Sequence, residues 1–192
     1  MFVSVFGAQV ALVVLFTLLF FGLLYGNLTV ADRLAPPIRP PGPEEDLLRG
    51  YHLAVGHRRG LVRLVLSGLF ALIAGLGVSG RWQEWLLFTN AVDFGVSDAQ
   101  FGRDLGFYIF RLPFMSFVIS WLFATLVVVL ILTTIFHYIN GGIRLQSVGE
   151  RVQPQVKAHL SVLLGLIALV RAGDYWLARF ELTTSNRGAV VG

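Results

Sequence analysis

Long apolar runs, separated by shorter polar segments, recur along the chain. The first covers residues 3–25, and no charged residue occurs before Asp32. Because an α-helix rises about 1.5 Å per residue, roughly 20 apolar residues cover the ~30 Å hydrocarbon layer of a bilayer. The pattern therefore predicts an all-α polytopic transmembrane bundle with spans at about residues 3–25, 64–80, 114–138 and 158–177.

The polar residues within and beside these runs refine their limits. In the second run, glycines permit close contact between helices in lipid. In the third, Pro113 suits a first helical turn, and Asn140 with Gly141 is typical of a helix end. The glycines of the second run are Gly68, Gly75 and Gly77.

Two of the segments between the spans have distinctive compositions. The segment 28–62 contains the Pro-rich tract "APPIRPPGPEED" and then a basic cluster, for which anionic lipid headgroups are the favoured partner and RNA the alternative. In the segment 81–112, Trp82 and Trp85 lie three residues apart, which predicts a short helix in the headgroup layer. The basic cluster comprises His52, His57, Arg58 and Arg59.

The distribution of Lys and Arg among the short loops predicts the orientation of the chain. The loops after the first and third spans hold nine basic residues, whereas the opposite side holds five. This bias places 28–62 in the cytoplasm and leaves 81–112 and both termini extracytoplasmic. The nine are Arg33, Arg39, Arg49, Arg58, Arg59, Arg63, Arg144, Arg151 and Lys157, and the five are Arg81, Arg103, Arg111, Arg179 and Arg187.

Composition supports a membrane protein over a soluble one. The 192 residues are 56% hydrophobic and 14% charged, whereas soluble domains carry about a quarter charged residues. The net charge of +4 is explained by the loops described above, so we predict a bilayer environment and no nucleic-acid partner. The absence of cysteine excludes disulfides and thiolate chemistry. We treat residues 1–192 as a single membrane domain.

The fourth run, "LIALVRAGDYWLARFEL", contains two charges, and these are the main candidate site. Arg171 and Asp174 lie three residues apart, so they share a helix face and can pair. Tyr175 and Trp176 follow at once, and such aromatic pairs mark the membrane interface. An interfacial pair is the favoured interpretation. A contact with another span and an ion or proton pathway are the alternatives.

Other polar residues offer weaker candidates. His137, at the end of the third span, is interpreted as an interfacial hydrogen-bonding group, with a proton relay or metal ligand as alternatives. The acids Asp93, Asp98 and Asp104 do not match a calcium-loop spacing, and Asp98 is better interpreted as a turn or cap residue. We predict no catalytic residues, no metal site and no cofactor.

Three strings of the chain resemble one known family. "FGVSDAQFGRDLGFYIFRLPF", "HYINGGIRL" and "HLSVLLGLIALVRAGDYWLARFEL" are similar to the bacterial family of uncharacterised integral membrane proteins UPF0182, over roughly residues 60–187. The resemblance implies an N-terminal membrane portion of a longer protein with a large extracytoplasmic region, truncated here at both ends. The resemblance implies a lysine in other members at the position of Arg171 and a small uncharged residue at the position of Asp174. The family has no established catalytic residues, so none is assigned to this chain.

These observations favour a non-catalytic role. We predict a membrane anchor or assembly module of a larger cell-envelope protein. Its partners would be the lipid bilayer and either other spans or an extracytoplasmic domain. The alternative is a subunit or fragment of a transporter or channel, in which Arg171, Asp174 and His137 would be the residues at stake.

Overall fold

Helix α1, Phe2–Arg33, runs the full length of the bundle in the computed structural model, which describes residues 2–36, 58–144 and 151–182. It continues beyond the predicted end of the first span because its polar side chains bond to its own carbonyls. Asn27 Nδ2 donates to the Leu23 carbonyl at 2.7 Å, and Thr29 Oγ1 donates to the Tyr25 carbonyl at 2.7 Å. Residues 28–33 are therefore helical rather than part of the predicted loop.

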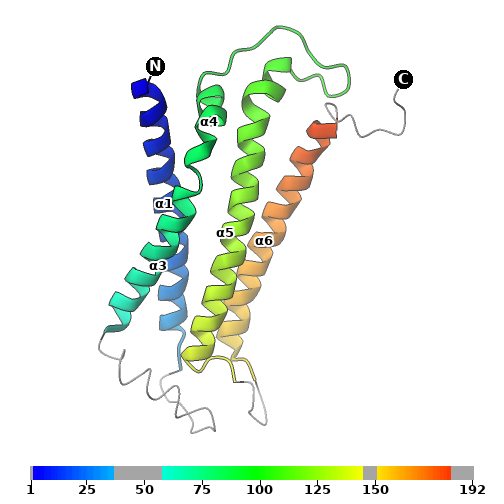
Figure 1. Cartoon of the computed structure of the whole chain (residues 1–192). Coiled ribbons are helices and arrows are strands. Elements are labelled where there is room, and N and C mark those ends of the chain that lie inside the picture. The colour runs from blue at the N-terminus through cyan, green and yellow to red at the C-terminus, as the bar shows by residue number, and fades with distance from the viewer. Residues whose placement is uncertain (1, 37–57, 145–150, 183–192) are drawn as a thin grey trace.

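The second apolar run forms α3, Arg59–Leu76, so residues 59–62 are also helical rather than part of the predicted loop. A 3-10 turn at Ser79–Arg81 joins α3 to the short helix α4, Trp82–Thr89, and Figure 1 shows α4 continuing upward from α3. The Trp82 and Trp85 side chains pack against a buried cluster of Leu12, Phe16, Val78 and Phe114. In this respect α4 differs from a helix that lies flat in the headgroup layer.

The third and fourth runs form an antiparallel pair. A π-helical turn, Phe107–Arg111, leads into α5, Leu112–Ile139, and the chain returns through α6, Pro154–Glu181. Helix α1 packs mainly against α3 and secondarily against α5, whereas α6 packs against α5. Figure 1 shows the resulting row of helices, with α6 at one edge.

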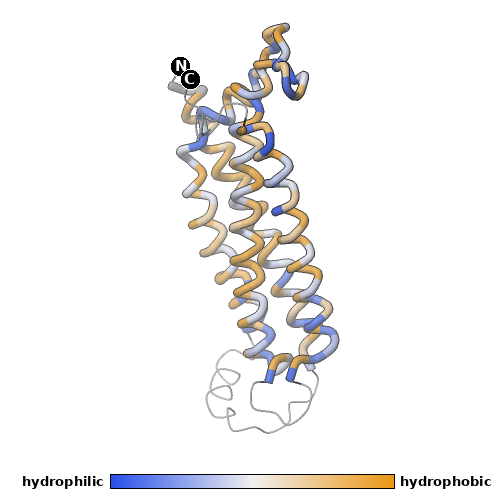
Figure 2. The backbone as a smooth tube through the Cα atoms, turned by 90° about the vertical axis from the view of Figure 1, so that its right-hand side faces the viewer, coloured by the Kyte–Doolittle hydropathy of each residue, from blue (hydrophilic) through white to orange (hydrophobic). Residues whose placement is uncertain are grey.

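The prediction of an all-helical chain with four apolar helices is confirmed. Four helices of the described residues are long and apolar enough to cross a membrane, namely those within Val5–Arg33, Arg59–Thr89, Phe107–Ile139 and Pro154–Glu181. Figure 2 shows hydrophobic colours along the middle of the tubes and more hydrophilic residues toward the ends. This banding is the one that a bilayer requires.

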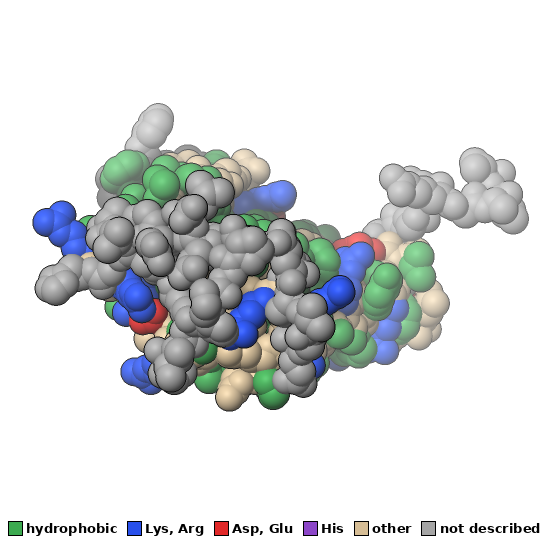
Figure 3. Space-filling model, turned by 90° about the horizontal axis from the view of Figure 1, so that it is seen from below, with side chains coloured by type: hydrophobic (Ala, Val, Ile, Leu, Met, Phe, Trp, Pro, Cys, Tyr) green, Lys and Arg blue, Asp and Glu red, His purple; other side chains and the backbone are tan. Residues whose placement is uncertain are grey.

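Basic side chains gather at one end of the bundle. We call the end with Arg33, Arg59, Ile139 and Pro154 the lower end, and the end with Thr89, Phe107 and Glu181 the upper end, as in Figure 1. Lys and Arg side chains surround the lower end in Figure 3. The described parts of the loops after the first and third spans, which the distribution of Lys and Arg predicts to share one side, thus lie at one end of the bundle. The interior of the Pro-rich segment, with His52 and His57, lies outside the described residues.

Close packing of α1 on α3 depends on one of the three glycines noted above. A β-carbon on Gly75 would overlap the Thr17 side chain and would lie 3.0 Å from the Val13 carbonyl oxygen. Gly68 has no atom within 4 Å of such a position, and Gly77 meets only carbonyls of its own helix at 3.6 Å. Close approach between these helices therefore requires glycine at residue 75.

Candidate functional site

Arg171 and Asp174 form an ion pair on α6. Arg171 Nη1 lies 2.5 Å from Asp174 Oδ2, and the two side chains remain 47% and 28% exposed. The Arg171 guanidinium also lies over the Phe123 ring of α5, 4.9 Å from its centroid, and over the Tyr175 ring at 5.3 Å. The pair is therefore anchored to the neighbouring helix yet half open on the surface, rather than enclosed among the helices.

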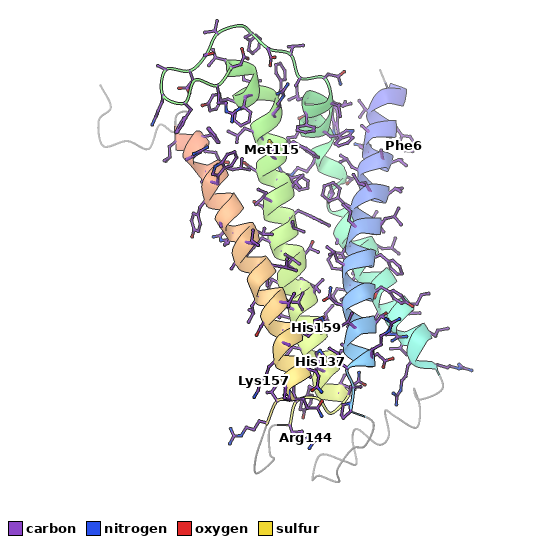
Figure 4. The ribbon with its side chains drawn as sticks, turned by 180° about the vertical axis from the view of Figure 1, so that it is seen from behind. Phe6, Met115, His137, Arg144, Lys157 and His159 are labelled. Atoms are coloured by element: carbon purple, nitrogen blue, oxygen red, sulfur yellow. The ribbon has the colours of Figure 1, made fainter. Side chains whose placement is uncertain are left out.

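His137 is the more unusual residue, because it is fully buried and contacts a second histidine. Its Nε2 lies 3.0 Å from Nδ1 of His159 on α6, and His159 Nε2 lies 3.1 Å from Asn27 Oδ1 on α1. His137 has no exposed surface. Figure 4 shows the two histidines together near the lower end, with Arg144 and Lys157 closer to that end. A chain of polar side chains thus joins α5, α6 and α1.

The positions of the two histidines in the sequence indicate this pairing, although the pattern of apolar runs alone does not predict it. His137 precedes the end of α5 by two residues, and His159 follows the start of α6 by five residues. Residues at similar distances from the turn of an antiparallel helix pair lie at the same level of the bundle. Asn27 is not among the candidates predicted from the sequence, because it lies beyond the predicted end of the first span at Tyr25.

The upper end carries an ordered loop, residues 90–106, which we call the cap loop. Residues 96–105 form a tight hairpin, in which the Leu105 amide donates to the Val96 carbonyl at 2.9 Å and the Asp98 amide to the Arg103 carbonyl at 2.8 Å. The positive φ of 63° at Gly102 falls in the left-handed region that glycine adopts without strain. The cap loop is therefore a folded element.

Two carboxylates hold the cap loop from within. Asp98 accepts hydrogen bonds from the amides of Gln100 and Phe101 at 2.8 and 2.7 Å, and from the Tyr108 hydroxyl at 2.8 Å. The Gln100 amide is the main reason that the pKa of Asp98 is lowered from its usual value; desolvation opposes this effect. Asp98 thus acts as a turn and cap residue.

Asp104 plays the same part at the base of the cap loop. It accepts hydrogen bonds from the amides of Phe94, Gly95 and Gly106 at 3.0, 2.8 and 2.7 Å. The Phe94 amide is the largest cause of the lowered pKa of Asp104, and desolvation opposes it. Asp93 lies 3.8 Å from Arg111 Nη2 instead. Among the described residues, no three His, Asp or Glu side chains are grouped to hold a metal ion.

Aromatic packing attaches the cap loop to the top of α6. Phe180, which is only 1% exposed, contacts Phe101 and Phe107 edge to face, with centroids 5.1 and 5.3 Å apart. Ser116 of α5 adds a hydrogen bond of 2.8 Å to Glu181. The cap loop, the start of α5 and the end of α6 consequently form one packed unit.

Comparisons with known proteins give a consistent result. The model of the uncharacterised protein family UPF0182 matches residues 1–192. The chain is similar to UPF0182 proteins of Frankia casuarinae, at 41% identity, and of Thermobifida fusca, at 42% identity. These alignments cover 100% and 84% of the chain but only 19% and 16% of the relatives' own length. No solved structure matches the chain.

Proposed function

Because the chain belongs to the uncharacterised protein family UPF0182, we propose that it serves as a non-catalytic membrane anchor and assembly module within a longer cell-envelope protein. The chain spans 19% of the length of the Frankia casuarinae relative. In this proposal the four apolar helices hold the module in the bilayer, and the cap loop is the surface against which the remaining part of the protein packs.

The observation that carries the proposal is a set of apolar side chains on the folded cap loop and the turn after it. Val92, Phe94 and Val96 are 57%, 50% and 57% exposed, and Leu105 and Ile109 are 41% and 52% exposed. Burying apolar surface stabilises a complex by about 25 cal/mol per Å². Because Asp98 and Asp104 fix the backbone, these side chains are presented without the cost of ordering a flexible loop.

The orientation of the module is part of the proposal. The bias of Lys and Arg toward the lower end supports a cytoplasmic lower end and an extracytoplasmic cap loop. The chain contains no cysteine, so single cysteines introduced at Gln100 and Arg151 report the two sides separately. A membrane-impermeant maleimide added to intact cells should label Gln100→Cys and leave Arg151→Cys unlabelled. The reverse pattern would overturn the orientation.

The docking role is tested by substitutions on the cap loop in a full-length family member. Deleting residues 93–110 would also remove the aromatic contacts with Phe180, so changes at exposed positions are more informative. When the membrane part and the extracytoplasmic part are produced as two separate chains, changes equivalent to Val92→Ser with Val96→Ser should weaken their co-migration on a native gel. Leu169→Ser, at a residue 71% exposed on α6, is the control. An unchanged complex in the cap-loop variant would refute the docking role.

A transporter or channel subunit is the second candidate, and the buried chain from His137 through His159 to Asn27 favours it, because polar groups inside a bundle often mark ion or proton sites. In that case His137→Gln, Arg171→Ala and Asp174→Ala should each reduce solute flux in reconstituted vesicles. Normal flux in all three variants would remove this candidate.

A further inference from the structure

One face of α5 carries three buried polar side chains near the lower end. Thr133, His137 and Asn140 are spaced four and three residues apart, so they lie on the same side of the helix. Their exposed fractions are 0%, 0% and 3%. Each has a polar atom without a hydrogen-bond partner among the described residues: Thr133 Oγ1, His137 Nδ1 and Asn140 Nδ2. Burying such atoms without a hydrogen-bond partner is unfavourable, because the water that they lose is not replaced.

The direction of the neighbouring hydrogen bonds follows from the amide of Asn27. Its Nδ2 donates to the Leu23 carbonyl, so its Oδ1 is the atom that faces His159 and must accept from His159 Nε2. A neutral His159 with its proton on Nε2 accepts at Nδ1, and His137 Nε2 is therefore the donor to it. The remaining atom, His137 Nδ1, is left with an unshared lone pair.

The Nδ1 atom of His137 lies beside the turn that closes the lower end. A β-carbon on Gly142 would lie 3.6 Å from His137 Nδ1 and 2.8 Å from Val156 Cγ2, so a residue larger than glycine at this position would crowd this side of the ring. The Gly142 amide donates to the His137 carbonyl at 2.9 Å, which fixes the turn beside the ring. The histidine pair thus lies nearer to the turn at the lower end than to the middle of the bundle, as Figure 4 shows.

We propose that His137 and His159 together form a proton-binding site that takes up one proton at His137 Nδ1 from the lower end of the bundle. The added proton bonds to Nδ1, and the ring becomes an imidazolium. Its Nε2 proton can then pass to His159 Nδ1, which moves the charge from α5 to α6. Transfer stops there, because the next acceptor, the amide oxygen of Asn27, does not hold a proton at physiological pH. The pair therefore stores a proton and does not conduct one through the bundle.

The surrounding charges determine which of the two histidines holds the added proton. His137 lies in the last turn of α5, where the free carbonyl groups of the helix end favour a positive charge. His159 lies near the start of α6, and the start of a helix disfavours a positive charge. Asp32 of α1, the one carboxylate that the described residues place at the lower end, is paired with Arg63 of α3 at 2.7 Å. The helix ends therefore favour the bound proton on His137, and the cations at the lower end of the bundle oppose it. These cations are Arg33, Arg144, Arg151 and Lys157.

Nitrogen NMR of ¹⁵N-histidine in lipid nanodiscs tests the proposal without altering the pair. The chain holds four histidines, so His52→Gln with His57→Gln leaves only the two rings of interest. At neutral pH both rings should be neutral and protonated on Nε2. Between about pH 8 and pH 4 the histidine pair should take up one proton, and both rings should respond over the same interval.

Two results would overturn the proposal: separate, independent titration of the rings, or no uptake across this range. The latter outcome would leave the pair as a neutral tether between helices. Asn27→Leu provides a second check, because it removes the acceptor that fixes His159. A mixture of the two neutral His159 tautomers is expected in that variant, whereas an unchanged spectrum would contradict the assigned bond directions. These outcomes are independent of the cap loop and of its proposed docking role.

Discussion

Phe101 of the cap loop packs edge to face against Phe180 of α6, with ring centroids 5.1 Å apart and planes inclined at 65°. Phe180→Ala should remove this attachment and leave a cavity, at a cost of about 3–5 kcal/mol in the free energy of unfolding. Thermal or denaturant unfolding in detergent measures the loss, and amide exchange should show faster exchange in the cap loop. Leu169→Ala on the same helix, at a residue 71% exposed, should change stability by less than about 0.5 kcal/mol. Equal effects in the two variants would show that Phe180 has no special role.

The contact between α1 and α3 yields a prediction in which two similar substitutions have opposite signs. Gly75→Ala forces a β-carbon against Thr17 and the Val13 carbonyl, and overpacking of this kind costs about 1–3 kcal/mol. Gly68→Ala meets no atom within 4 Å and should stabilise α3 by up to about 1 kcal/mol through helix propensity. The unfolding temperatures of the two variants, measured in the same detergent, test whether the two substitutions have opposite effects on stability. Stabilisation by both changes would contradict the close approach at residue 75.

The ion pair between Asp32 and Arg63 should matter more than the pair between Glu84 and Arg81. The two carboxylates are similarly exposed, at 23% and 25%, but the arginines differ, at 15% for Arg63 and 51% for Arg81. Asp32→Ala leaves a largely buried guanidinium without its charged partner and should cost about 1.5–3 kcal/mol. Glu84→Ala should cost no more than about 1 kcal/mol. Chemical denaturation compares them, and equal losses would refute the argument from burial.

The cap loop should loosen in acid at Asp98. Amide hydrogen bonds, that of Gln100 foremost, lower the pKa of this carboxyl below its ordinary value of 3.8. The carboxylate therefore supports the loop fully above the unfolded value, and this support is lost as the pH falls through the lower, folded value. Amide shifts of Gln100 and Phe101 should report a transition below pH 3.8 that is absent from Asp98→Asn. A transition at or above 3.8 would contradict the assignment.

Much of the fold could be predicted because a bilayer imposes a simple length rule. Apolar runs located all four helices, three of them without any charged residue. Close helix contact was predicted at Gly68, Gly75 and Gly77, and of these three the structure places only Gly75 against another helix. The helix ends were less predictable. Hydropathy fell at Gly26 and Asn27, but the helix continues because Asn27 and Thr29 bond to its own carbonyls and Leu28 is buried.

The candidate sites were less predictable because they depend on partners that are distant in the sequence. Arg171 and Asp174 are neighbours on one helix turn, so spacing alone indicated their pairing. His137 finds its partner on α6, and that partner is fixed by Asn27 on α1. The backbone amides that Asp98 and Asp104 bind depend on the path of the cap loop, which a pattern of apolar and polar residues does not specify.

Cysteine protection on the cap loop tests the proposed docking role most directly. A single cysteine replacing the residue aligned with Val96 is compared in a full-length family member and in its portion aligned with residues 1–192, both in the same nanodiscs. The account predicts markedly slower maleimide labelling in the full-length protein, and equal labelling in both forms for a control cysteine aligned with Arg151. Equal labelling at both positions would show that nothing covers the cap loop and would contradict its role as the docking surface of an assembly module.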